Sequence, residues 1–240
     1  MQSSMQNMQA FFAVLLEPLR AKSARYLLLA LVLQGLYWYS VAPAPGAAHN
    51  TINSAALRIV ITVLLFLVIP LVAMVWEENL SWQQLRCRWL TWGDVSAGLL
   101  PTVVCSAVAI VALWFGTRDT QLQATYPWAG AWAGMNLVNL LVWSLLRLVY
   151  YSAFEFFYRG FLMVTVRQHY GLVMAVWLQA SCSFLIHVGT PTAEVMAALP
   201  AGFLFAALAL RGHSLVYPIV FHWVIGMSTD IFCLYRLGLL

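Results

Sequence analysis

Apolar residues occur along this chain in runs long enough to cross a bilayer, separated by short polar or proline-containing stretches. A transmembrane helix needs about 20 predominantly apolar residues. Helical spans are predicted over residues 26–43, 56–76, 97–115, 136–166, 171–188, 195–210 and 214–235. Helices are expected because backbone groups in lipid must hydrogen-bond within their own segment, and no series of short alternating segments indicates a barrel. The expected fold is an all-α, polytopic transmembrane helical bundle.

Helix-breaking residues fall between these runs. Residues 42–50 contain two prolines and a glycine, residues 117–121 are polar, and residues 189–192 provide a helix stop followed by a new N-terminus with Pro191 in its first turn. The run over 136–166 would measure about 46 Å as a straight helix, which is longer than the hydrocarbon core. We therefore expect this helix to be tilted or broken near Gly160.

The first residues differ from the rest of the chain. An apolar stretch within residues 8–19 ends in Pro18 and basic residues, which favours a helix lying on the membrane surface. Residues 1–25 are thus predicted to be a cytoplasmic, interfacial segment, and residues 26–240 a single integral membrane domain. An alternative is that residues 1–48 are a cleaved signal peptide, since small residues follow the first apolar run.

Basic residues are distributed unequally between the loops. The positive-inside rule places a majority of Lys and Arg on the cytoplasmic side. With a cytoplasmic N-terminus, seven basic residues lie at inner positions and three at outer ends: Arg20, Lys22, Arg25, Arg86, Arg88, Arg167 and Arg211 against Arg58, Arg118 and Arg236. We expect a multi-pass protein of the inner (plasma) membrane with this orientation.

Composition supports the same class of protein. The chain is 63% hydrophobic and only 8% charged, whereas soluble domains are about 25% charged. The net charge of +4 is scattered, so nucleic acid is not an expected partner. Aromatic residues near span ends are predicted to be interfacial anchors: Trp76, Trp92, Trp114, Tyr126 and Trp128. The four cysteines lack a C-x-x-C pairing and are predicted to be small core residues: Cys87, Cys105, Cys182 and Cys233.

Two charged residues lie within the apolar run 136–166. A charge inside a membrane is costly, roughly 2.5–3.5 kcal/mol on insertion scales, and such residues usually mark functional sites. Glu155 and Arg159 are four residues apart on one helix face, where each can neutralise the other. The pair is therefore a candidate catalytic element, although an ion pair that only specifies packing is the structural alternative.

Further titratable residues occur at comparable depths in other predicted spans. His187, His222 and Asp230 lie in two of them, and Glu194 follows Pro191 in a first helical turn. These groups are candidate catalytic residues that could line one cavity with Glu155. The alternatives are interhelical hydrogen bonding for the histidines, a solvated acid near the chain end for Asp230, and a favourable helix-dipole position for Glu194.

These residue types favour hydrolysis by activated water. Poor solvation increases the proton affinity of Glu155, and the neighbouring Arg159 decreases it. Together they can give Glu155 the proton affinity that a general base needs. His222 or His187 would then donate to the developing oxyanion. A divalent metal, possibly zinc, held by Glu155, His187 and His222 is an alternative, but no H-E-x-x-H element fixes the ligand spacing. A serine or cysteine peptidase is less well supported, because no G-x-S-x-G motif occurs.

The run Phe154-Glu-Phe-Phe-Tyr-Arg-Gly-Phe-Leu162, with His187 ending the next helix and His222 in the last, resembles the CPBP family of Abi or CAAX-protease-like intramembrane proteases. The likeness covers roughly residues 97–235. The family motifs are Glu-Glu-x-x-x-Arg, Phe-x-x-x-His and His-x-x-x-Asn. Three positions differ here: Phe154, Ser183 and Gly226 replace the first Glu, the Phe and the Asn. The chain therefore looks like a variant branch with a single glutamate in the first motif.

The resemblance implies peptide-bond hydrolysis of a membrane-anchored peptide or protein in the lipid bilayer, by glutamate-activated water and without a required cofactor. Because Phe154 replaces the leading glutamate, Glu155 must be the base, or Glu194 or Asp230 must take over, or the site is inert. Prenylated C-termini and membrane-anchored C-terminal sorting helices are both possible substrates by resemblance. The alternative function is a non-catalytic membrane protein that binds peptides, as an immunity or chaperone-like factor.

Overall fold

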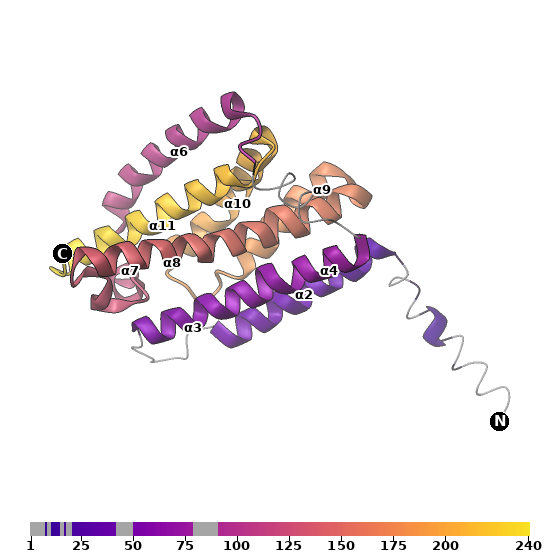
Figure 1. Cartoon of the computed structure of the whole chain (residues 1–240), viewed down its shortest axis with the longest axis horizontal. Helices are drawn as coiled ribbons and strands as arrows, with labels where there is room; N and C mark the ends of the chain where they lie inside the picture. Colours follow the sequence, from indigo (N-terminus) through magenta and orange to yellow (C-terminus); the bar gives the residue numbers. More distant parts are fainter. Residues whose placement is uncertain (1–7, 9–10, 15–16, 18–20, 42–49, 79–90) are drawn as a thin grey trace.

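The computed structural model describes residues 8, 11–14, 17, 21–41, 50–78 and 91–240 (Figure 1). All regular elements within these ranges are helical, which confirms the expected all-α membrane bundle. The elements are α2 (Lys22–Val41), α3 (Ile52–Val63), η2 (Leu64–Val68), α4 (Ile69–Glu78), α6 (Val95–Gly116), α7 (Thr120–Thr125), η3 (Gly130–Gly134), α8 (Leu137–Glu155), η4 (Phe156–Leu162), α9 (Met163–Leu185), α10 (Thr192–Gly212) and α11 (Val216–Arg236).

Five helical runs of the described chain are long and apolar enough to cross a membrane: Ile52–Trp76, Val95–Gly116, Leu137–Leu185, Thr192–Gly212 and Val216–Arg236. The third run has 49 residues and is interrupted at Gly171, where φ is 79°. Its two arms correspond to the predicted spans 136–166 and 171–188. Helix α2 covers most of the predicted first span, and the total number of crossings stays a prediction.

The long helix is not broken at Gly160. Residues Phe156–Leu162 form the π-helical segment η4 between α8 and α9, and the sharp change of direction comes at Gly171. A π-helical turn shifts the side-chain register and is frequent at functional sites. Here it begins directly after Glu155 and contains Arg159, so the irregular turn lies at the predicted catalytic motif.

Side-chain caps explain where several helices begin. Thr51 and Ser54 form a capping box at the start of α3, and Asn136 Oδ1 accepts from the Asn139 N–H at the start of α8, over 2.9 Å. Asp94 caps α6 by accepting from the Ala97 N–H at 3.0 Å. Hydrogen bonds from Ser96 and from this N–H lower the pKa of Asp94 below its usual value. These caps satisfy backbone donors that the helix cannot pair itself.

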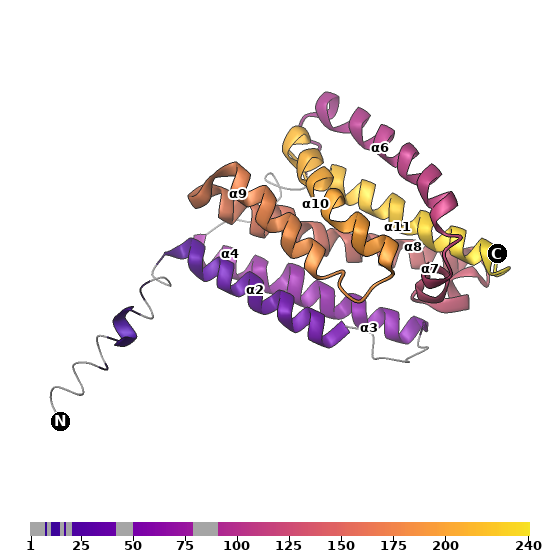
Figure 2. The same cartoon turned by 180° about the vertical axis from the view of Figure 1, so that it is seen from behind.

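The long α8–η4–α9 helix lies in the middle of the bundle (Figures 1 and 2). On one side, α2 lies alongside the α3–η2–α4 run (Figures 1 and 2). Phe66 of η2 joins this pair to the centre, because its ring stacks on Phe157 with centroids 4.2 Å apart. On the other side, α11 packs against α8 and α6, and α10 packs against α9 and α6. The candidate site residues therefore come from the centre and from this second group of helices.

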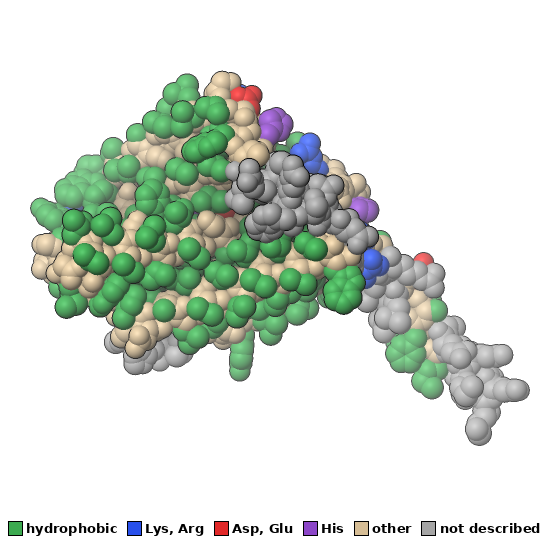
Figure 3. Space-filling view, viewed as in Figure 1, with side chains coloured by type: hydrophobic (Ala, Val, Ile, Leu, Met, Phe, Trp, Pro, Cys, Tyr) green, Lys and Arg blue, Asp and Glu red, His purple; other side chains and the backbone are tan. Residues whose placement is uncertain are grey.

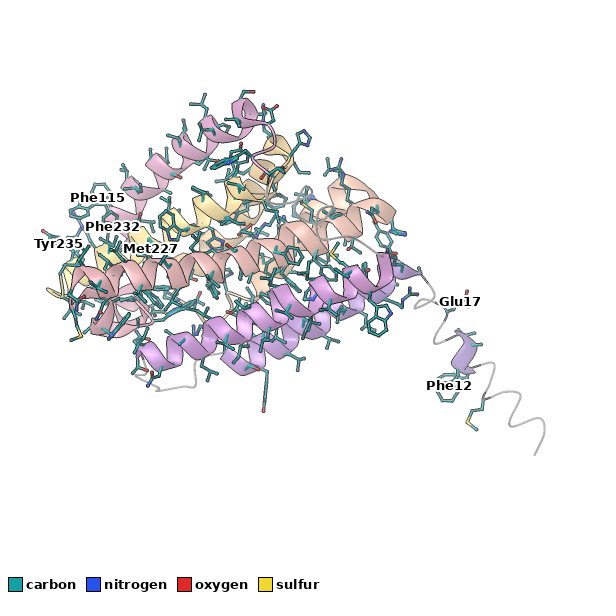
Figure 4. All side chains as sticks on the ribbon, viewed as in Figure 1. Phe12, Glu17, Phe115, Met227, Phe232 and Tyr235 are labelled. Atoms are coloured by element: carbon teal, nitrogen blue, oxygen red, sulfur yellow. The ribbon has the colours of Figure 1, made fainter. Side chains whose placement is uncertain are left out.

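The outer surface suits lipid. Hydrophobic side chains cover most of the face in Figure 3, while charged and histidine side chains gather toward one end. Aromatic residues mark the opposite end, where Phe115, Phe232 and Tyr235 lie together between α6 and α11 (Figure 4). Trp76 and Trp92 are 82% and 60% exposed, as expected of interfacial anchors.

Tyr126 is a correction to the predicted anchors, because it is buried beside the candidate site. Cys182 and Cys233 are buried and Cys105 is partly buried, in agreement with their predicted packing role. Cys87 and half of the predicted surface helix over 8–19, residues 9–10, 15–16 and 18–19, lie outside the described residues.

Candidate active site

A cavity of about 370 Å³ lies between α8, α10 and α11 and is closed on one side by the last turns of α6. We call it the central cavity. Apolar residues and small alanines of α10 form much of its wall. The polar side chains that line it are Tyr126, Arg147, Tyr151, Ser183, His187, Glu194, His222 and Thr229. Both predicted histidines and one predicted carboxylate thus share this space.

Glu155 connects Arg159 to His222 at the base of the central cavity. Its Oε1 lies 3.2 Å from Arg159 Nη1 and 2.5 Å from His222 Nδ1. The Glu155 side chain is fully buried and the His222 side chain is 13% exposed. Because the carboxylate accepts at Nδ1, His222 Nε2 is the ring nitrogen left for a ligand in the cavity. Glu155 itself does not line the cavity and acts on it only through His222.

Two aromatic rings fix the orientation of the His222 imidazole. Tyr151 stacks on the imidazole with centroids 4.1 Å apart, and Phe205 stacks on it at 4.6 Å. The interplanar angles are 29° and 28°, so both rings stack on the imidazole with a moderate tilt. A catalytic group held in this way loses little entropy when it meets a substrate.

His187 and Glu194 form a second acid–imidazole pair on the central cavity. The Ser183 carbonyl can only accept, so His187 donates to it from Nδ1, at 2.6 Å. This leaves His187 Nε2 facing Glu194 Oε1, 3.7 Å away. The two side chains are 20% and 23% exposed. Glu194 therefore combines access to the cavity with a neighbouring imidazole.

Tyr126 holds the other oxygen of Glu194. Its hydroxyl donates to Glu194 Oε2 over 2.7 Å. Burial, and then the negative charge of Glu194, raise the pKa of Tyr126 well above its usual value, so the hydroxyl stays a donor at physiological pH. Glu194 lies in the first turn of α10, where the helix dipole favours a carboxylate. The favourable helix-dipole position predicted for Glu194 is therefore compatible with its place on the central cavity.

Phe154 occupies the space between the two imidazoles. Its ring centroid lies 5.3 Å from that of His222 and 6.2 Å from that of His187. The residue is 2% exposed, so an apolar ring occupies the position of the leading glutamate in the family motif. Phe154 therefore keeps the two acid–imidazole pairs apart.

Asp230 is not a solvated acid near the chain end. It is fully buried, its Oδ2 lies 3.1 Å from Arg147 Nε, and it accepts from Trp143 Nε1 at 2.9 Å. The Arg147 guanidinium also packs over the ring of Trp128, 4.5 Å from its centroid. Asp230 does not line the central cavity, whereas Arg147 does. The ion pair stabilises the packing of α8 on α11 at one end of the cavity.

A polar route reaches His187 and Glu194 from outside. A space of about 60 Å³ is lined by both residues and by Arg58. Arg58 and Thr190 also line a larger, polar opening of about 750 Å³ formed by the ends of α2, α3 and α7. We call these two spaces the polar opening. The two spaces share Arg58 and Thr190 as lining residues, and the smaller one borders the second acid–imidazole pair.

The donor set does not fit a three-ligand metal centre. Glu155 Oε1 already contacts both Arg159 and His222, and a guanidinium beside a cation is unfavourable. Within residues 21–41, 50–78 and 91–240, no three His, Cys, Asp or Glu side chains are grouped closely enough to hold a metal ion. We derive no catalytic step through a metal.

Several residues of the site were not predicted from the sequence. Arg147 could have been found, because it is a charge within an apolar span, as Glu155 is. Tyr151 and Phe205 gave no signal, since aromatic residues are common in apolar helices. Their contacts with His222 depend on how α8, α10 and α11 pack.

The family comparison agrees with this part of the molecule. Residues 136–228 match the family model described as Rce1-like, type II CAAX prenyl endopeptidase Rce1-like. The matched segment begins at the cap of α8 and ends within α11, so it contains both acid–imidazole pairs. No curated protein and no solved structure matches the chain significantly.

Proposed function

We propose that this chain, whose residues 136–228 belong to the CAAX-protease-like family, is an intramembrane endopeptidase that hydrolyses a membrane-anchored peptide with activated water. Membership of the family supports endopeptidase activity in general. The observation that carries the mechanism is the central cavity, because the His187–Glu194 pair lines it together with His222, whose other ring nitrogen is held by Glu155.

Glu194 is the proposed general base. Of the three candidate carboxylates Glu155, Glu194 and Asp230, only Glu194 lines the central cavity. A base must come within hydrogen-bond reach of the proton that it takes. In the proposed step Glu194 accepts a proton from water while the water oxygen attacks the peptide carbonyl carbon. Glu194 then returns the proton to the leaving nitrogen as the C–N bond breaks.

His222 is the proposed oxyanion donor. In this step it would have to take a second proton, which the Glu155 carboxylate favours, and would then donate Nδ1–H to Glu155 and Nε2–H to the negative oxygen that develops on the carbonyl. The Glu155 carboxylate stabilises this imidazolium, and Arg159 holds Glu155 in place. His187 orients the water or Glu194 through its Nε2. Glu155 and Arg159 are thus positioning residues in this scheme.

Phe154 makes the chain a variant of the family pattern. The leading glutamate of the first motif is absent, and Glu194 approaches His187 from the start of α10 and lines the cavity with His222. We propose that Glu194 supplies the missing carboxylate from a different helix. The apolar, alanine-rich wall of the cavity favours an extended or unwound peptide from a transmembrane segment as substrate.

The chain would act in the inner (plasma) membrane with its N-terminus cytoplasmic, as the distribution of basic residues predicts. In that orientation the polar opening lies at the outer end of the bundle. Water would therefore reach Glu194 from the non-cytoplasmic side.

A non-catalytic peptide-binding protein is the second candidate, and the buried Phe154 in place of a glutamate is the observation that favours it. The test compares purified wild type with Glu194→Gln, in a detergent-solubilised assay of prenylated and unprenylated membrane peptides. Loss of a general base should reduce cleavage by about 10²–10⁴-fold, with peptide binding retained. Cleavage that is equal in the two proteins would overturn Glu194 as base. No cleavage by the wild type, with binding retained, would support the second candidate.

A further inference from the structure

A second pocket, separate from the central cavity, lies where α9, the end of α10 and the start of α11 meet. It has a volume of about 200 Å³ and is lined by Arg159, Arg167, His213 and Ser214 together with apolar side chains. No carboxylate of the described chain lines it. We call it the cationic pocket. Its volume is smaller than that of most drug-sized ligand sites, about 300–1,000 Å³, and suits one small anionic group.

Arg159 gives this pocket a buried, incompletely paired charge. The residue is 1% exposed, and only its Nη1 contacts Glu155. Its Nε and Nη2 have no hydrogen-bond partner among the described residues. A buried donor without a partner costs about 1–3 kcal/mol. Arg159 lines the cationic pocket, so an anion bound there would be attracted to its incompletely paired guanidinium.

The junction of α10 and α11 adds to the positive potential. His213 ends α10 in the left-handed conformation, with φ at 49°, and its side chain lines the pocket. The N-terminal end of α11, which carries the positive end of the helix dipole, follows at Val216. The Ala209 carbonyl at the negative end of α10 already accepts from the N–H groups of His213 and Ser214.

The cationic pocket runs from the membrane interior to the surface. Arg167 is exposed and lies four residues before Gly171, where the helix turns back. Arg159 is eight residues deeper, or about 12 Å along the helix axis. Arg167 belongs to the side that carries most of the basic residues, and the leaflet on the cytoplasmic side is rich in anionic lipid.

We propose that the cationic pocket binds a phosphate group, presented by an anionic glycerophospholipid of the adjacent leaflet. Arg167 and His213 contact the phosphate at the surface, and the buried guanidinium of Arg159 contributes its positive charge at the inner part of the site. Guanidinium groups suit this ligand because their fixed donors match phosphate oxygens. Arg159 also holds Glu155 in the proposed proteolysis, but the ligand would not enter the central cavity, so lipid retention and cleavage are measured separately.

Native mass spectrometry of the detergent-purified full chain tests this site. The probes are phosphatidylglycerol, phosphatidylcholine as the neutral lipid, and glycerol 3-phosphate with inorganic phosphate as free phosphates. Arg167→Gln and His213→Asn remove outer contacts, and asparagine tolerates the left-handed backbone. Arg211→Gln is the matched control, because it removes a charge from the same end of α10 and does not line the pocket.

The wild type and Arg211→Gln should retain phosphatidylglycerol in preference to phosphatidylcholine. Retention should fall about tenfold in Arg167→Gln, as expected when one charged hydrogen bond of about 1.5 kcal/mol or more is lost. Equal binding of the free phosphates at the same residues would identify a soluble ligand for the phosphate site. Retention that is unchanged in Arg167→Gln and His213→Asn, or equal for both lipids, would overturn the proposal, whatever the outcome of the protease assay.

Discussion

Replacing Glu155 by glutamine should separate the structural role of this residue from its effect on catalysis. The change keeps the size of the side chain and removes its charge. Arg159 is then a buried cation without its carboxylate, and His222 Nδ1 faces a neutral amide oxygen in place of the charged acceptor that lies 2.5 Å away. Breaking a buried ion pair by removing one partner costs about 3–5 kcal/mol. For a chain of this length, that corresponds to a fall of about 6–20 °C in the unfolding midpoint.

The double variant Glu155→Gln/Arg159→Met removes both charges. Because no uncompensated ion remains, it should recover much of the midpoint that the single variant loses. It should not recover proteolysis, since the imidazolium of His222 still lacks its carboxylate. We expect cleavage to stay lower by about 10²–10³-fold, the usual cost of losing an oxyanion donor. Thermal unfolding in detergent and cleavage of a membrane peptide measure the two effects independently.

Glu194→Gln is the matched control for stability. The Glu194 side chain is 23% exposed, and the glutamine carbonyl can still accept from Tyr126, so the midpoint should fall by less than about 4 °C. An unfolding midpoint of Glu155→Gln equal to that of the wild type would refute the buried ion pair. A double variant no more stable than the single one would refute the electrostatic explanation.

Two other changes test neighbouring contacts. Asp230→Asn should lower the unfolding midpoint more than Glu194→Gln does. The reason is that Arg147, which is 2% exposed, loses its carboxylate at 3.1 Å. Circular dichroism on heating measures the midpoint, and an unchanged value would contradict the prediction. Tyr126→Phe should preserve the fold and reduce kcat by about 3- to 10-fold, because Glu194 Oε2 loses a hydrogen bond worth about 0.5–1.5 kcal/mol. An unchanged kcat would show that Tyr126 does not position the base.

Much of the bundle could be predicted from hydrophobic runs and helix breakers. The stop and restart at residues 189–192 and the spans over 97–115, 195–210 and 214–235 correspond to observed helices. The position of the sharp turn could not be predicted in the same way. Both Gly160 and Gly171 are compatible with a break in the helix. Gly160 lies instead within a π-helical turn whose residues are all buried.

Candidate site residues could be chosen because charges and imidazoles are rare inside apolar helices. The pairing of these residues could not be predicted from the sequence, because it depends on tertiary packing. Asp230 and His222 lie in one predicted span and were both expected at one cavity with Glu155, whereas the fold pairs Asp230 with Arg147 and His222 with Glu155. Tyr126 near a span end resembled a surface anchor, and only the packing of its loop on α10 brings it to Glu194.

The central claim is that Glu194 and His222 act on one substrate within the central cavity. The most direct test is mass-spectrometric identification of new protein termini in membranes of cells that express the wild type, Glu194→Gln, His222→Ala or the control Arg211→Gln. We predict new termini within or at the edge of transmembrane segments for the wild type and Arg211→Gln, and their loss in both site variants. The same set of termini in all four samples would contradict the proposed chemistry.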